Sequence, residues 1–84
     1  MFYRSSRFRK NFKKYPQKIR ADAFERLGLL EKNEFDYELN NHKLSGKYGE
    51  YRSINVTSDI RILYKKVKDG FYLFAIGTHS ELYK

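Results

Sequence analysis

Apolar residues near the start of the chain recur at helical spacing. Phe8, Phe12 and Tyr15 stand at i, i+4 and i+7, so they form one stripe on a helix whose first turn the hydroxyls of Ser5 and Ser6 can cap. Pro16 then ends this helix or starts the next one, because its ring fixes φ and removes an amide donor.

A second helix is predicted to follow and to run to about Lys32. Its apolar face consists of Ile19, Ala23, Phe24, Leu27 and Leu30. Gly28 weakens this helix by roughly 1 kcal/mol relative to Ala, and close approach of another helix could explain its presence. Two helices joined by a short turn predict an N-terminal helical hairpin.

Between about residues 33 and 48 the periodicity disappears. Asn, Gly, Ser and Lys alternate there with the isolated apolar residues Phe35, Leu39 and Leu44, which predicts a loop pinned at those three points. Loops of this length in a compact domain are usually functional, because ordering them costs entropy that packing alone seldom offsets.

Strand-like segments fill most of the remaining chain. Alternating apolar and polar residues predict three strands at 50–57, 59–67 and 71–77, and residues 2–3 begin a further short extended segment. Thr57-Ser58 and Asp69-Gly70 are hairpin signals, the second because Gly accepts positive φ without steric cost. An antiparallel meander is therefore expected.

Alternation along the first of these strands separates two faces. One face carries Arg52, Ile54 and Val56, and the other carries Tyr51, Ser53 and Asn55. We expect one face to pack on the helical hairpin and the other to be more polar and open. The predicted fold class is α+β, a helical hairpin against a small antiparallel sheet, in a single domain over residues 1–84.

Composition narrows the possible functions. The chain lacks Cys, and no His and carboxylate cluster shows ligand spacing, so we expect neither a disulfide framework nor a bound metal or other cofactor. No signal peptide or membrane-spanning run is visible, which predicts a cytoplasmic protein with no membrane partner. The net charge of +8 arises in the first twenty residues, which hold eight basic and no acidic side chains.

A basic block of this kind is the electrostatic footprint of a polyanion binder, because each neutralised phosphate releases counterions. A solvated helix face, or a surface for an acidic protein, would have the same composition. The candidate RNA-binding or ribosome-binding residues combine this block with later basic positions: Arg7, Arg9, Lys10, Lys13, Lys14, Lys43, Lys47 and Arg52.

Only two histidines occur, His42 in the long loop and His79 after the last strand. Metal-independent RNA cleavage needs a base to activate the 2′-hydroxyl and an acid to protonate the departing oxygen, and imidazole suits both roles near neutral pH. Arg61 is the candidate cation for the phosphoryl oxygens. Two histidines are nevertheless an ordinary count for this length, and spacing alone is weak evidence of a catalytic pair.

Tyr83 is a second candidate contact for RNA. An exposed ring can stack on an unpaired base, although a terminal Tyr is just as often a packing anchor.

Four motifs, in order, resemble the RelE/ParE superfamily of toxins, and most closely its YafQ-like branch. They are HKLSG at 42–46, EYR at 50–52, DIRILYK at 59–65 and IGTHSELY at 76–83. The branch typically has an H-x-L-x-G loop, a G-Y-R strand start, a strand ending in I/L-Y-K and a terminal G-[ST]-H-[SA]-x-L-[FY].

The resemblance implies a ribosome-dependent mRNA endoribonuclease that an acidic antitoxin binds and blocks. It places His42 at the general base, His79 at the general acid, Asp59 at a catalytic-region carboxylate and Tyr83 at the terminal aromatic. Ser53 stands where the branch has Asp, and Arg61 resembles the phosphate-binding Arg of RelE and YoeB relatives. The chain therefore has features of both groups.

The expected partners are mRNA, ribosomal RNA at the ribosomal A site and the cognate antitoxin. Two alternatives remain open: a ParE-like toxin that poisons DNA gyrase without RNA chemistry, and an inactive basic module that binds RNA or protein. The ParE-like relatives lack the histidine set, so the nuclease comes first.

Overall fold

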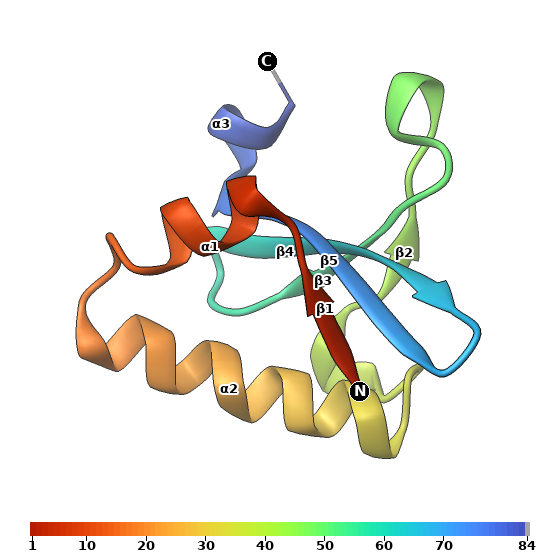
Figure 1. The fold of residues 1–84 in the computed structure, drawn as a ribbon, viewed down its shortest axis with the longest axis horizontal. Helices are drawn as coiled ribbons and strands as arrows, with labels where there is room; N and C mark the ends of the chain where they lie inside the picture. The colour runs from red at the N-terminus through yellow and green to blue at the C-terminus, as the bar shows by residue number, and fades with distance from the viewer. Residues whose placement is uncertain (84) are drawn as a thin grey trace.

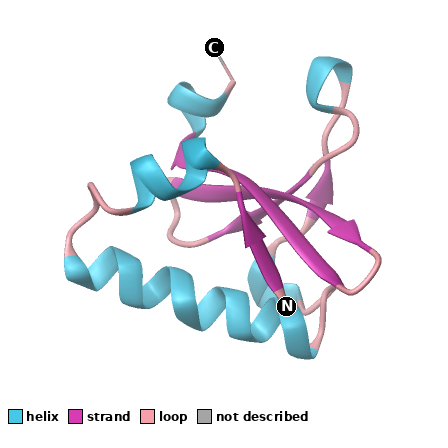
Figure 2. Ribbon diagram, in the orientation of Figure 1, coloured by secondary structure: helices cyan, strands magenta, loops and turns pink. Residues whose placement is uncertain are grey.

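A five-stranded sheet in the order β1-β5-β4-β3-β2 organises the computed structural model, which describes residues 1–83 (Figure 1). The strands are β1 (Phe2–Arg4), β2 (His42–Lys43), β3 (Arg52–Asn55), β4 (Ile60–Val67) and β5 (Gly70–Thr78). The helices are α1 (Ser6–Phe12), α2 (Gln17–Lys32) and α3 (His79–Leu82), with 3-10 turns η1 (Tyr37–Leu39) and η2 (Gly46–Tyr48) (Figure 2).

The predicted antiparallel meander is present as β3, β4 and β5, but the sheet is mixed. β1 pairs with β5 in parallel, and β2 adds an antiparallel edge strand to β3. Residues 2–3 were expected to be extended, whereas the pairing of residues 42–43 was not expected. Two residues are too short a segment to show an alternating pattern.

The main core lies between the sheet and α1 and α2. Ser5 caps α1 by accepting a hydrogen bond from the Phe8 amide, and the ring of Phe8 is then almost fully buried. Facing it are apolar side chains from all three long strands. The buried members of this core include Ala23, Leu27, Leu30, Leu39, Ile54, Val56, Ile62, Tyr64 and Leu73.

The helical hairpin is not confirmed as a unit. α1 packs chiefly on β5, while a T-shaped contact between the rings of Phe12 and Phe24, 5.3 Å apart, links the two helices. Phe24 was expected in the core, but its side chain is 60% exposed. No atom would meet a Cβ at Gly28 within 4 Å, so close helix approach does not explain that glycine.

The opposite face of the sheet was predicted to be open. It carries instead a second core cluster. Leu63 and Ala75 are buried there beneath Leu82 of α3, with Phe74 and Tyr83 at the margin. A β-bulge makes this possible, because Leu63 pairs with Ala75 while Tyr64 pairs with Leu73, which leaves Phe74 as the extra residue of β5. Figure 1 shows α3 and the segment around η2 on the side of the sheet away from α2.

The hairpin between β4 and β5 is shifted by one residue from its prediction. Val67 pairs with Gly70, so the turn is Lys68-Asp69, and Gly70 does not have positive φ. Its lack of a side chain serves another purpose: a Cβ would collide with the Met1 carbonyl, to which the Phe71 amide donates. Gly70 thus admits the N-terminus beside β5.

The long segment at 33–48 is pinned less by Phe35 than expected. Leu39 is fully buried and Leu44 packs against the second cluster, as predicted, but Phe35 is 63% exposed. The segment is instead ordered by hydrogen bonds, which position the first candidate catalytic residue.

Candidate active site

His42 lies on the edge strand β2, opposite Ser53. Paired residues share a face, so its side chain lies on the side of the sheet that carries Leu63 and the second cluster. The ring is exposed, and its Nδ1 lies 3.0 Å from the Asn40 carbonyl oxygen. A proton on Nδ1 donates to that carbonyl, which leaves the Nε2 lone pair free to accept a proton.

Asn40 supplies this carbonyl from a left-handed conformation, with φ of 48°. Asn tolerates that region better than other non-glycine residues, because its short side chain relieves the steric cost. It closes η1 and directs the chain into β2.

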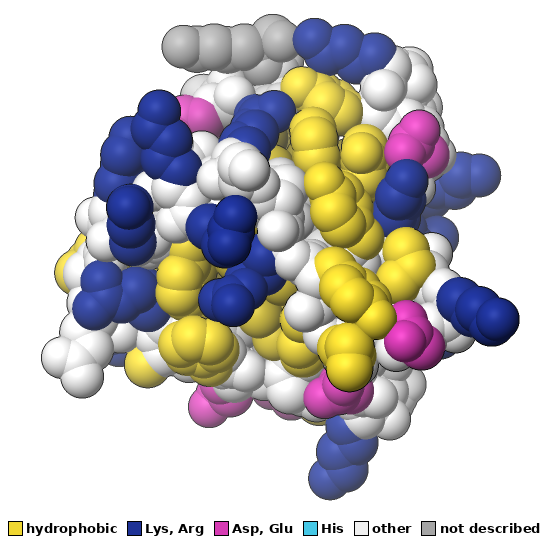
Figure 3. Space-filling model, viewed as in Figure 1, with side chains coloured by type: hydrophobic (Ala, Val, Ile, Leu, Met, Phe, Trp, Pro, Cys, Tyr) yellow, Lys and Arg dark blue, Asp and Glu magenta, His cyan; other side chains and the backbone are white. Residues whose placement is uncertain are grey.

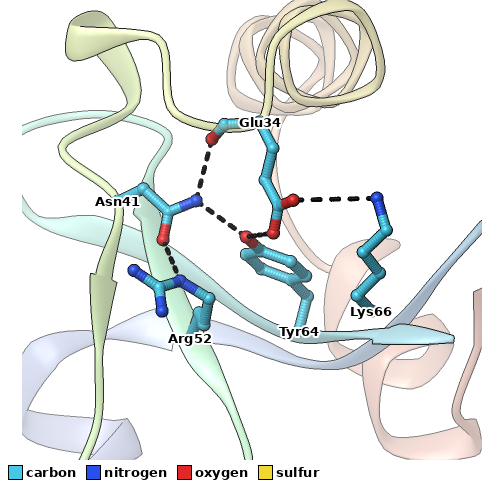
Figure 4. Close-up of polar contacts among 5 residues, drawn as sticks. All are labelled: Glu34, Asn41, Arg52, Tyr64 and Lys66. Carbon is cyan, nitrogen blue, oxygen red and sulfur yellow. Dashed lines mark hydrogen bonds and ion pairs between the residues drawn. The ribbon is translucent and has the colours of Figure 1, made fainter.

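Asn41 ties the same segment to the body of the protein (Figure 4). Its Nδ2 donates to the Tyr64 hydroxyl at 2.7 Å and to the Glu34 backbone carbonyl at 2.9 Å, and its Oδ1 accepts from Arg52 Nε at 2.7 Å. The Tyr64 hydroxyl donates in turn to Glu34 Oε2 at 2.8 Å. Lys66 completes this Tyr64 network with an ion pair to Glu34.

Tyr64 is the buried centre of the network. Burial raises the pKa of its phenol well above the ordinary value, and the Glu34 carboxylate raises it further, while Asn41 and Arg52 act in the opposite direction. The phenol therefore remains a protonated hydrogen-bond donor near neutral pH. Arg52, a candidate RNA contact from sequence, is half-buried here, with its guanidinium 5.1 Å from the Phe35 ring centroid.

Arg61 of β4 lies on the same face of the sheet as His42 of β2. Asn55 and Arg61 are partners in register, two residues beyond the Ser53–Leu63 pair on each strand. The Arg61 Nε donates to Asn55 Oδ1 at 3.1 Å, which orients the partly exposed guanidinium. The terminal nitrogens of such a group can bind phosphate.

His79 opens α3, directly after β5. The helix begins with a capping box, in which Thr78 Oγ1 accepts from the Glu81 amide and Glu81 Oε1 accepts from the Thr78 amide. The exposed imidazole packs against the Tyr83 ring with centroids 4.5 Å apart. This helix covers the face of the sheet on which His42 and Arg61 lie.

Tyr83 behaves first as a packing anchor. Its ring joins the second cluster and meets Tyr48 of η2 at 6.4 Å between centroids. Its hydroxyl is buried and has no hydrogen-bond partner among residues 1–83. Through Tyr48, the loop that follows His42 thus reaches the helix that carries His79.

Asp59 is exposed in the turn before β4. Burial raises the pKa of Tyr15, and the negative charges of Glu81 and then Asp59 raise it further. No contact joins Asp59 to either imidazole within the described part of the chain.

Ser53, at the position where the resembling branch has Asp, is fully buried beneath His42. Its hydroxyl lacks a hydrogen-bond partner among the described residues.

The basic candidates on and after α1 are all exposed: Arg7, Arg9, Lys10, Lys13 and Lys14. Arg7 and Lys14 border a cleft of about 410 Å³ between α1 and the start of α3, with Thr78 and Glu81 on its other side. Lys43 and Lys47, near His42, are exposed as well.

Sequence reasoning named both imidazoles and Arg61, and the fold places all three on one side of the sheet. No direct contact joins His42 to His79 among residues 1–83. The sequence reasoning missed the supporting residues Asn40, Asn41, Glu34, Tyr64 and Tyr48. The consecutive asparagines before His42 were an available signal for a left-handed turn.

Residues 1–83 contain neither a metal-binding cluster nor a membrane-spanning helix. No group of three or more His, Asp or Glu side chains there could hold a metal ion. In the same range, none of the helices combines the length and apolar character needed to cross a bilayer.

Comparison with known proteins identifies the family to which the chain belongs. The family of YafQ toxins, described as bacterial toxins of type II toxin-antitoxin systems, matches residues 1–84. The chain belongs to the YafQ toxin family. YafQ from E. coli has the same fold, with a TM-score of 0.85 at 20% identity, over 100% of this chain and 98% of that one. No curated protein sequence gave a significant match.

Two other solved structures extend the comparison. A copper-bound mutant toxin from Helicobacter pylori has a TM-score of 0.76 at 25% identity, over 98% of this chain and 97% of that one. YafQ in its complex with the antitoxin DinJ from E. coli has a TM-score of 0.77 at 22% identity, covering 100% and 97%. Other similar structures include a YoeB-YefM complex from Staphylococcus aureus.

Proposed function

We propose that this YafQ-family toxin is an mRNA endoribonuclease that acts on the translating ribosome and uses the 2′-hydroxyl of its substrate as nucleophile. The observation that carries the proposal is the placement of two exposed imidazoles and a guanidinium on one side of the sheet, in a member of a toxin family.

The chemical roles follow from how each side chain is held. His42, with Nδ1 directed at the Asn40 carbonyl, accepts the 2′-hydroxyl proton on Nε2. The 2′-oxygen then attacks phosphorus, the bond to the 5′-oxygen breaks, and His79 donates a proton to that oxygen. Arg61 stabilises the phosphoryl charge. The products are a 2′,3′-cyclic phosphate and a 5′-hydroxyl, and no metal is required.

The remaining candidates act around this centre. Tyr83 holds the His79 ring and presents its partly exposed ring to a base, while Asp59 adds a carboxylate at the sheet edge. The exposed basic residues of α1 and of the loop after His42 bind ribosomal RNA and mRNA phosphates.

The partners and compartment follow from the same proposal. The toxin works in the cytoplasm, where ribosomes are, and is held inactive by an acidic antitoxin, as the solved complexes of similar toxins with DinJ and YefM suggest.

The test is expression of the chain and of His79→Ala in cells, followed by primer extension on mRNA. The wild type is expected to arrest growth with cleavage within translated codons, and His79→Ala to lower cleavage roughly 100-fold or more. Arrest with intact mRNA and a DNA-damage response would identify a gyrase poison instead. Growth without arrest would identify an inactive binding module.

A further inference from the structure

A row of aromatic rings crosses the surface beside the candidate site; four of them touch ring to ring, and the fifth, Tyr72, shares the Lys65 ammonium with Tyr51. We call Tyr72, Tyr51, Phe74, Tyr48 and Tyr83 the aromatic band. Tyr51 stacks on Phe74 with centroids 4.4 Å apart, Phe74 meets Tyr48 at 6.2 Å, and Tyr48 meets Tyr83 at 6.4 Å. Each ring is partly exposed, and the last one contacts His79.

Alternation along β5 places two of these rings on one surface. Tyr72 and Phe74 are two residues apart on either side of Leu73, which faces the main core, so both face the second side of the sheet. The bulge at Phe74 then keeps Ala75 on the second side as well, where strict alternation would turn it towards the main core.

Cations lie directly over the rings of the band. The Arg7 guanidinium is 5.1 Å from the Phe74 centroid, the Lys47 ammonium 5.3 Å from Tyr48, and the Lys65 ammonium 5.7 Å from Tyr51 and 5.8 Å from Tyr72. Lys65 also pairs with Glu50 at 3.0 Å. Figure 3 shows a strip of hydrophobic side chains on one face of the molecule, with Lys and Arg on both sides.

The band ends at Tyr83, whose ring contacts the imidazole of His79. Phe74 and Tyr83 also pack against the second cluster, but each remains partly exposed. Aromatic rings interleaved with cations are the common means of holding single-stranded nucleic acid, because bases stack on rings while cations meet the phosphates.

We propose that the aromatic band binds single-stranded RNA that flanks the cleaved bond, with bases on the rings and phosphates near Arg7 and Lys47. The proposal rests on the proposed nuclease function, because the RNA on the band flanks the cleaved bond only if His79, at the end of the band, is the catalytic acid. The rings, and not the charge, favour RNA over a protein occupant. An acidic protein segment would complement the cations equally well, whereas the bases of RNA also stack on aromatic rings.

The test measures binding of a single-stranded RNA of mixed sequence, 2′-O-methylated throughout so that it cannot be cleaved, and of the matching duplex. Tyr51→Leu and Tyr72→Leu remove a ring but keep apolar volume, whereas Tyr51→Phe keeps the ring. Tyr37→Leu is the matched control, because Tyr37 is 89% exposed on η1 and lies outside the band. Thermal unfolding of each variant confirms that it is folded.

Each Leu variant in the band is expected to weaken single-strand binding roughly 5- to 100-fold, with little change for the duplex, for Tyr51→Phe or for Tyr37→Leu. Tyr72→Leu decides the matter if Tyr51→Leu does not fold. The proposal is overturned if the wild type binds the single strand no better than the duplex, or if Tyr37→Leu weakens binding as much. It is overturned equally if the band variants lose affinity only for an acidic antitoxin.

Cleavage is measured in parallel on unmodified mRNA. Loss of cleavage in His79→Ala with unchanged binding of the modified strand keeps the two proposals separate. If the wild type does not cleave mRNA but still binds the modified strand through its rings, the nuclease proposal is rejected and the RNA-binding role of the aromatic band is retained.

Discussion

The two imidazoles of the candidate site are held in different ways. His42 sits on an edge strand of two residues, yet the neighbouring Asn41 is tied to Glu34, Tyr64 and Arg52 by hydrogen bonds that span 7 to 23 residues of sequence. His79 sits on a helix of four residues, held by a local capping box and by the packing of Leu82 and Tyr83.

This difference determines how firmly each imidazole is positioned. Polar groups that are buried and mutually satisfied fix one geometry, because every alternative leaves a donor or acceptor unpaired. Apolar packing of a single helical turn allows more movement. We therefore expect His42 to be rigid and His79 to be the mobile half, as suits an acid that must follow a departing oxygen.

The largest loss of stability is expected when the packing of α3, the helix that carries His79, is disrupted. Leu82→Ala removes a side chain that is 2% exposed and should lower the free energy of unfolding by about 2–5 kcal/mol. Hydrogen exchange should show α3 amides losing protection before those of β4. Leu82→Met, which keeps the volume, should cost less than about 1.5 kcal/mol. Equal loss of protection in both elements would contradict an independently mobile α3.

The next effect is expected in the Tyr64 network. Tyr64→Phe deletes the hydroxyl between Asn41 and Glu34 and should cost about 1–3 kcal/mol, because a largely buried carboxylate loses its donor. Chemical denaturation measures the loss, with Tyr37→Phe as the exposed control. An imidazole ¹⁵N spectrum should show His42 losing its single tautomer in the Tyr64 variant alone.

The pH dependence of stability gives a second test of the buried Tyr64 hydroxyl. The folded-state pKa of Tyr64 is raised above its ordinary value of 10.0, so its contribution is complete below pH 10 and falls as the unfolded chain ionises above it. The stability difference between wild type and Tyr64→Phe should shrink by up to about 1.4 kcal/mol per pH unit above pH 10. A difference that stays constant from pH 9 to pH 11 would show that the phenol is not buried as described.

The smallest effect concerns the cap of α3. Thr78→Ala removes the hydroxyl that accepts from the Glu81 amide and should lower the free energy of unfolding by about 1 kcal/mol, while Thr78→Ser should change it little. The cap acts locally, so the His42 spectrum should be unchanged in both variants. A shift in His42 resonances would mean that the two halves are coupled.

The helical and strand elements were predictable because their apolar side chains repeat at 3.6 or 2 residues over long segments. α2 ends at Lys32 as expected, and the hairpin of β4 and β5 is displaced by one residue. Phe24 and Phe35 were misplaced because an exposed aromatic follows the same periodicity as a buried one. The strand pairing of β1 and β2 depends on tertiary contacts that leave no local pattern.

The site was predictable only in part, for a related reason. His42, His79 and Arg61 were found because their chemistry and motifs are visible in the sequence. The hydrogen-bonded support through Asn41, Tyr64 and Glu34 joins residues up to 30 positions apart, and the bulge at Phe74 turns Ala75 to the second face of the sheet. Neither feature follows from periodicity.

The central claim is that His42 acts as base and His79 as acid on one phosphodiester. The most direct measurement is single-turnover cleavage on programmed ribosomes, with mRNA whose scissile 5′-oxygen is replaced by sulfur, a leaving group that needs no protonation. His79→Ala should cleave this substrate nearly as fast as the wild type does, while His42→Ala should remain slow. Rescue of both variants, or of neither, would contradict the assignment.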